Sequence, residues 1–185
     1  MTRDKRVFVD VETTGLDPAT GLLLEVGILV TDLDCRPLGT CYQYSVVLPI
    51  NPMTAWEACD PYVQKMHTEN GLFEDLDKPN NRTVEEIENS ILQFLASVGV
   101  APNAKTEICG YNPGFDLDWL KAHLPKVASC FTHRKLDVRS VALVMTGLGY
   151  DSPERLDHTT HRALNDCISA AHDLAYWQGL IVKVS

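Results

Sequence analysis

The feature that most constrains this chain is an apolar segment near its start, residues 7–12, which ends in acidic residues. The segment predicts a β-strand, in which alternate side chains share a face, so Asp10 and Glu12 should lie on one face about 7 Å apart. Two neighbouring carboxylates at a buried strand end repel each other and are costly to desolvate unless a cation or a proton compensates them. Neither acid has a Lys or Arg beside it in the strand, so a metal ion held by oxygen ligands is the simplest compensator. Taken alone, such a pair more often marks an acidic strand end that points into solvent, and the metal-site interpretation depends on residues further along the chain.

Composition limits the class of protein. The 185 residues, of which 45% are hydrophobic and 22% charged, suit one globular domain over residues 1–185 that can bury a core without disulfides or zinc. The six cysteines form no C-x-x-C pair, which favours a reducing, cytoplasmic location over a disulfide framework. We expect no signal peptide and no contact with a membrane, because the chain lacks an apolar run of the required length. A net charge of −9 argues against electrostatic coating of long nucleic acid, but it permits a short substrate neutralised locally by metal.

The pattern of predicted elements indicates an α/β fold. Short turns join three predicted strands, residues 7–12, 22–30 and 41–48, which should therefore form an antiparallel meander. The clearest helix opens with a capping box of Thr83 and Glu86. Further helices are expected within 54–77 and at 116–123, 140–145 and 162–180, and further strands at 106–111 and 135–138. We expect a mixed sheet of roughly five strands with helices on both faces.

Three more polar residues lie at predicted element ends where they could meet the acidic pair. Asp116 follows a short strand and falls in the first turn of the next helix, a position from which an acid can reach a strand end in α/β folds. Asp118 is the alternative, but it points about 200° away around a helix. His161 and Asp166 are separated by about 140° on an ideal helix, so they share a site only if His161 precedes or opens the last helix.

Three motifs together resemble those of the DEDD exonucleases, which have an RNase H-like fold. The motifs are VDVETTGLD at residues 9–17, GYNPGFD at 110–116 and THRALND at 160–166. The interval from His161 to Asp166 resembles the histidine subgroup, DEDDh, and along almost the whole chain the similarity is greatest to the oligoribonucleases. The resemblance implies a 3′→5′ exoribonuclease that degrades short oligoribonucleotides to 5′-mononucleotides.

The same resemblance implies catalytic roles for five residues. His161 would be the general base that takes a proton from the attacking water. Four carboxylates would hold two divalent metal ions, Mg²⁺ or Mn²⁺, around the scissile phosphate. These four metal ligands are Asp10, Glu12, Asp116 and Asp166.

A second group of residues would hold the 5′ end of the substrate and so restrict its length. Leu16 would wedge between bases, and Tyr62 would stack on a base where an oligoribonuclease has Trp, with His67 five residues further on. Arg134 would contact a phosphate. His133 stands where an oligoribonuclease has a Tyr contributed by the second subunit of a homodimer, so the preferred length of the oligonucleotide stays open.

Two alternatives to an oligoribonuclease follow from the sequence. One is a proofreading-type DEDDh exonuclease that acts on single-stranded DNA or on longer strands. The other is a nuclease-fold binding module without activity, against which the presence of all five motif residues argues. RNA and DNA substrates are not distinguished by the sequence, because a contact to a 2′-hydroxyl depends on geometry.

Overall fold

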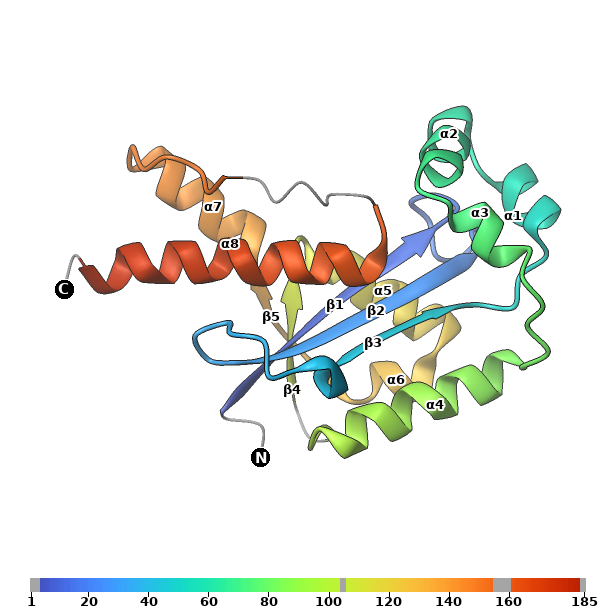
Figure 1. The fold of residues 1–185 in the computed structure, drawn as a ribbon, viewed down its shortest axis with the longest axis horizontal. Helices are drawn as coiled ribbons and strands as arrows, with labels where there is room; N and C mark the ends of the chain where they lie inside the picture. The colour runs from blue at the N-terminus through green and yellow to red at the C-terminus, as the bar shows by residue number, and fades with distance from the viewer. Residues whose placement is uncertain (1–3, 104–105, 155–160, 184–185) are drawn as a thin grey trace.

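The computed structural model describes residues 4–103, 106–154 and 161–183, and within these ranges the strands form one five-stranded sheet in the order β3-β2-β1-β4-β5 (Figure 1). Strands β1 (Lys5–Thr13), β2 (Leu23–Asp32) and β3 (Gln43–Val47) pair antiparallel. Strands β4 (Thr106–Gly110) and β5 (Phe131–Asp137) are parallel to β1. The predicted mixed sheet with a meander is therefore confirmed.

Helices cover both faces of this sheet (Figure 1). Helices α4 (Val84–Ser97), α5 (Pro113–His123) and α6 (Pro125–Ala128) pack on one face, whereas α7 (Val138–Gly147) and α8 (Ala163–Lys183) pack on the other. A separate layer of three short helices lies near the end of β1: α1 (Pro52–Ala58), α2 (Pro61–Glu69) and α3 (Leu72–Leu76). A 3₁₀ turn, η1 (Thr40–Tyr42), precedes β3. None of the helices in the described ranges has the length and apolarity that crossing a membrane requires.

The alternation of β1 divides its side chains between the two faces. Val7, Val9 and Val11 are buried in the core that α4, α5 and α6 cover. Phe8 instead belongs to the core beneath α8. Since Asp10 and Glu12 continue the series that begins with Phe8, their carboxylates lie on the α8 side of the sheet.

Several element boundaries differ from the sequence prediction for identifiable reasons. Strand β5 begins at Phe131, four residues before its predicted start, because the polar residues at 132–135, of which 133–135 are exposed, hide the strand signal. Helix α5 begins at Pro113, which tolerates the first helical position because no hydrogen bond from its nitrogen is needed there. Helix α6 was not predicted. The capping box of Thr83 and Glu86 is confirmed.

Gly27 lets the start of α8 approach the sheet beside Asp10. Gly27 is the direct neighbour of Asp10 across the β1–β2 ladder. A Cβ atom at this position would lie 2.3 Å from both the carbonyl carbon of Ala163 and the nitrogen of Leu164. Only a residue without a side chain therefore allows the first turn of α8, which carries Asp166, to lie on the strand of Asp10.

Gly27→Ala is accordingly expected to displace α8 and to reduce both stability and activity. Overpacking of this kind costs about 1–3 kcal/mol in the free energy of unfolding, measured by urea denaturation. The matched control is Gly179→Ala, because nothing lies within 4 Å of the new methyl group and α8 should gain about 0.5–1 kcal/mol. Equal stability of the Gly27→Ala and wild-type proteins would contradict the packing described here.

Candidate metal and catalytic site

Three carboxylates converge where the end of β1 meets the start of α8. One oxygen atom from each of Asp10, Glu12 and Asp166 lies within 4.8 Å of the other two. Asp10 and Glu12 share a face of β1, and Asp166 falls in the first turn of α8, which crosses that face. Residues more than 150 positions apart in the sequence are thus brought into one cluster.

Asp116 approaches the same strand from the opposite helix layer. Its side chain is buried, and its Oδ1 accepts a hydrogen bond of 3.0 Å from the backbone nitrogen of Val11, between the two strand acids. The alternative ligand, Asp118, is exposed and forms an ion pair of 2.7 Å with Lys121. The structure therefore brings Asp116, and not Asp118, to the end of β1.

Burial raises the pKa of all three clustered carboxyl groups and that of Asp116. The pKa of Glu12 rises to about 9, mainly through burial and then through the charges of Asp166 and Glu25. Burial raises the pKa of Asp116 to about 7 and that of Asp166 to about 6, and His161 partly offsets the second shift. The pKa of Asp10 is also raised, first by burial and then by the charges of Asp116 and Glu12. Without a bound cation, the folded protein therefore favours the protonated, neutral forms of these carboxyl groups, because ionising them together would place uncompensated negative charge in a buried site.

The donor set suits a hard divalent cation. All of the converging groups are carboxylate oxygens, which Mg²⁺ and Mn²⁺ prefer over nitrogen or sulfur. Arg162 is the cation that lowers the pKa of Glu12, but its guanidinium group is already occupied by other acids. A bound cation would supply the missing positive charge, so the cluster can hold metal.

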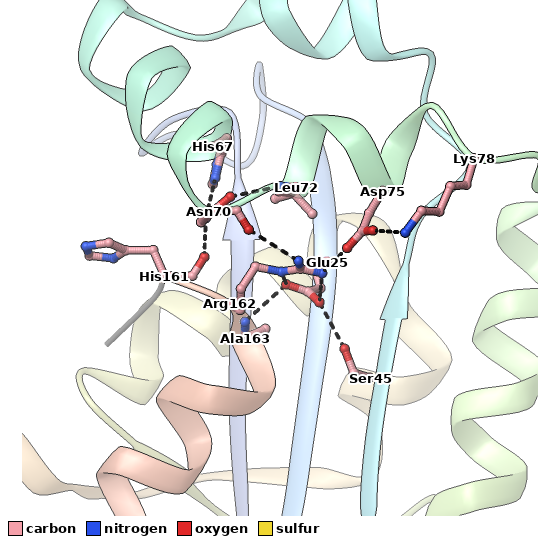
Figure 2. Close-up of polar contacts among 10 residues, drawn as sticks. All are labelled: Glu25, Ser45, His67, Asn70, Leu72, Asp75, Lys78, His161, Arg162 and Ala163. Atoms are coloured by element: carbon pink, nitrogen blue, oxygen red, sulfur yellow. Dashed lines mark hydrogen bonds and ion pairs between the residues drawn. The ribbon is translucent and has the colours of Figure 1, made fainter. Parts of the chain in front are cut away.

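His161 lies two residues before the start of α8, which satisfies the condition for sharing a site with Asp166. Its side chain is exposed, and its backbone adopts φ = 47° in the left-handed region. Figure 2 shows the imidazole ring pointing away from Arg162, while the carbonyl oxygen accepts a hydrogen bond from the side chain of Asn70. The ring is thus available to a ligand, whereas the backbone is held by the protein.

An ion pair behind this site was not predicted from the sequence. Glu25 on β2 accepts two hydrogen bonds of 3.0 Å from Arg162 and one of 3.1 Å from the backbone nitrogen of Ala163. Arg162 also bonds Asp75 at 2.6 Å. Two signals could have identified the pair, because Glu25 is the one charged residue in the apolar run 22–30 and Arg162 directly follows His161.

The structure separates the predicted base-contacting residues. Leu16 and Tyr62 are 87% and 71% exposed, so both side chains can contact a ligand. His67 is instead fully buried, and its Nε2 lies 3.0 Å from the carbonyl oxygen of Thr13. The expectation that His67 contacts substrate is therefore corrected to an internal contact, since its ring is buried and meets the ring of Phe73 on α3 edge-on at 5.8 Å between centroids.

His133 and Arg134 lie on the exposed edge strand β5, far from the carboxylates of the same chain. The strand registers align Lys135 with Ile108 and Ile108 with Val7, so Arg134 lies near the level of Arg6. Glu12 is six residues further along β1, roughly 20 Å at 3.3 Å per residue. Within one chain, the structure does not bring these two residues to the site.

Comparisons with known proteins give a consistent picture. A family model described as Exonuclease (RNase_T) matches residues 7–172. Among curated relatives, an oligoribonuclease of Cutibacterium acnes is 31% identical over 97% of this chain and 87% of its own length. An oligoribonuclease of Haemophilus influenzae is 30% identical over the full length of both chains.

Solved structures share the fold. E. coli exonuclease I in complex with a dT13 oligonucleotide superposes with a TM-score of 0.71 at 18% identity, covering 97% of this chain. The chain spans only 42% of that larger protein. S. pombe Pop2p, in a form with Mg²⁺ and Mn²⁺ bound, gives a TM-score of 0.69 at 12% identity and covers 100% of this chain and 86% of its own. The predicted RNase H-like exonuclease fold is confirmed.

Proposed function

The chain belongs to the RNase T exonuclease family, and from this membership we propose that it hydrolyses short oligoribonucleotides from their 3′ ends, releasing 5′-mononucleotides. The observation that carries the proposal is the cluster of Asp10, Glu12 and Asp166, whose oxygens converge within 4.8 Å. Full-length similarity to oligoribonucleases supports short RNA as the substrate. Family members of this kind are metal-dependent 3′→5′ exonucleases, and we propose one such domain over residues 1–185.

The residues divide the chemistry between them. Asp10, Glu12, Asp116 and Asp166 would hold two divalent ions, Mg²⁺ or Mn²⁺. When bound, such ions lower the pKa of a water ligand and stabilise charge on the leaving 3′ oxygen. His161 would accept the proton of the attacking water, a role open to an exposed imidazole that is near enough to Asp166 to lower the pKa of that carboxyl group.

Substrate length would be set at two places. Leu16 and Tyr62 present exposed apolar surface close to the end of β1, where Leu16 would wedge between bases and Tyr62 would stack on one. His133 and Arg134 lie too far along β5 to reach the site of their own chain, so we propose that they act across a homodimer on the neighbouring site. We also propose a cytoplasmic location, which suits six free cysteines.

A chain-length series tests this function directly. RNA and DNA oligonucleotides of two to about 20 nucleotides are incubated with the protein and Mn²⁺, and kcat/KM is measured for each. We expect the highest values for RNA of two to four nucleotides. Equal or faster loss of the 20-mer would exclude the preference for short substrates, and faster cleavage of DNA would favour the proofreading-type alternative. Sedimentation at the assay concentration tests the homodimer.

A further inference from the structure

A chain of hydrogen bonds connects the metal-binding strand to the backbone of His161. Burial lowers the pKa of His67, so its ring is neutral near pH 7. In the neutral ring, Nε2 donates to the carbonyl oxygen of Thr13, the residue after Glu12, at 3.0 Å. The other nitrogen, Nδ1, then accepts from Nδ2 of Asn70 at 3.4 Å. This arrangement fixes both the tautomer of His67 and the orientation of the Asn70 amide.

Asn70 completes the connection. Its Nδ2 also donates to the carbonyl oxygen of His161, and its Oδ1 accepts from the backbone nitrogen of Leu72 at 2.9 Å (Figure 2). Both polar atoms of the Asn70 amide therefore have partners. The nitrogen contacts His67 on α2 and the carbonyl oxygen of His161, and the oxygen contacts Leu72 on α3. Asn70 lies between α2 and α3, so it joins the helix layer that carries Tyr62 to His161, two residues before α8.

The residue after His161 is held from the other side. The guanidinium group of Arg162 donates two hydrogen bonds to the buried carboxylate of Glu25 and one to Asp75. The backbone N–H of Ala163 donates to the same carboxylate of Glu25. Ser45 donates a further hydrogen bond of 2.9 Å to Glu25, so this carboxylate is fully engaged. Bidentate contacts between Arg and a carboxylate fix orientation as well as distance.

The backbone of His161 needs such support. A φ of 47° is unfavourable for a residue other than glycine, and it persists only where the surroundings hold it. Two sets of contacts hold adjacent residues: the hydrogen bond from Asn70 to the carbonyl oxygen of His161, called the Asn70 anchor below, and the ion pair between Glu25 and Arg162. Together they leave the imidazole ring as the free part of the residue.

From these contacts we infer that Asn70 and Arg162 are positioning residues, which hold His161 at the distance from the carboxylates that proton transfer needs. The inference rests on the proposed function, because it assigns these residues to the base of that reaction. It also links the base to the helix layer beyond the end of β1. Asn70 is the residue through which that link is tested, since its role can be changed without disturbing the buried Glu25.

Asn70→Asp removes the donor to His161 and retains an acceptor for Leu72. Asn70→Ser removes the amide without adding a charge, and it covers the case in which the new carboxylate itself disturbs the site. For both variants we expect kcat on an RNA dinucleotide to fall about 10–100-fold, with KM changed less than about threefold and Mn²⁺ affinity retained. The matched control is Asn80→Ser, since Asn80 also donates to a backbone carbonyl, that of Val47, at 3.3 Å.

A double-mutant cycle separates positioning from other roles. In a His161→Ala background, Asn70→Ser should have no further effect on kcat, because the residue through which it acts is gone. Three results would overturn the inference. They are a wild-type kcat in both Asn70 variants, a change in KM with kcat unaffected, and an equal fall in kcat when Asn70→Ser is added to His161→Ala.

Hydrogen exchange tests the Asn70 anchor, the hydrogen bond to the carbonyl oxygen of His161, independently of activity. The backbone amides of residues 161–164 should exchange faster in Asn70→Ser than in wild type and in Asn80→Ser. Unchanged exchange would overturn the inference even if the protein cleaved no RNA. An inactive wild-type protein with faster exchange in Asn70→Ser would instead refute the proposed function and leave the anchor in place.

Discussion

Asp10→Asn is expected to reduce cleavage of short RNA by at least about a thousandfold and, in the same protein, to raise stability in the absence of metal. The loss of activity follows because metal-bound charge stabilises the transition state by several kcal/mol, and about 4 kcal/mol corresponds to three powers of ten in rate. The gain in stability follows because Asp10 lies among other buried acids that raise its pKa. Turnover and thermal unfolding in EDTA measure the two effects.

The control for this variant is Asp118→Asn. Asp118 is on the same helix as Asp116 but is exposed and paired with Lys121 on the surface. The same chemical change there should leave both turnover and unfolding temperature within error of wild type. Unchanged turnover in Asp10→Asn would refute the metal site, and a lower stability in EDTA would show that the cluster is not a source of repulsion.

Stability without metal is expected to fall as the pH rises from 7 to 8.5. The pKa of Glu12 is about 9 in the folded protein and near 4.5 when unfolded, so over this range the folded state binds about one proton more than the unfolded state. Stability decreases with pH wherever the folded state binds more protons, by about 1.4 kcal/mol per proton and pH unit. We therefore expect the free energy of unfolding in EDTA to drop by about 1–2 kcal/mol across this window.

Two comparisons test whether the carboxylate site causes this fall in the free energy of unfolding with pH. Glu12→Gln should reduce it, because one of the groups that hold extra protons in the folded state is then absent. Mn²⁺ should remove or reverse it, since metal competes with protons for the carboxylates and binds more tightly as the pH rises. A window above pH 7 also avoids His67, whose lowered pKa makes stability fall at the acid side instead. Stability that is constant or rises with pH in EDTA, over the same range, would contradict the raised pKa values.

The sequence predicts the parts of the site that depend on local periodicity. The alternation in β1 places Asp10 and Glu12 on one face, and the phase of α5 separates Asp116 from Asp118; both follow from the repeat of a single element. The position of His161 ahead of α8 follows in the same way. Helix α5 begins three residues before its predicted start, but the relative orientation of Asp116 and Asp118 depends only on the helical repeat and is unchanged.

The remaining parts of the site depend on which elements pack together, and no local pattern specifies that. Glu25 and Arg162 are 137 residues apart, and they pair only because α8 starts over β2 at Gly27. His67 was expected to contact substrate because its position, five residues after Tyr62, matches the pattern of the oligoribonucleases. The packing of α3 against α2 decides instead that this ring is buried.

The central claim is that the carboxylate cluster removes nucleotides from the 3′ end with the help of divalent metal. Its most direct test is a time course on an RNA trinucleotide with a labelled 5′ phosphate, in Mn²⁺ and in EDTA, with products resolved by length. We predict that the labelled dinucleotide appears first and the labelled mononucleotide later, and that neither forms in EDTA or with Asp10→Asn. A labelled mononucleotide as the first product, or cleavage that persists in EDTA, would contradict this account.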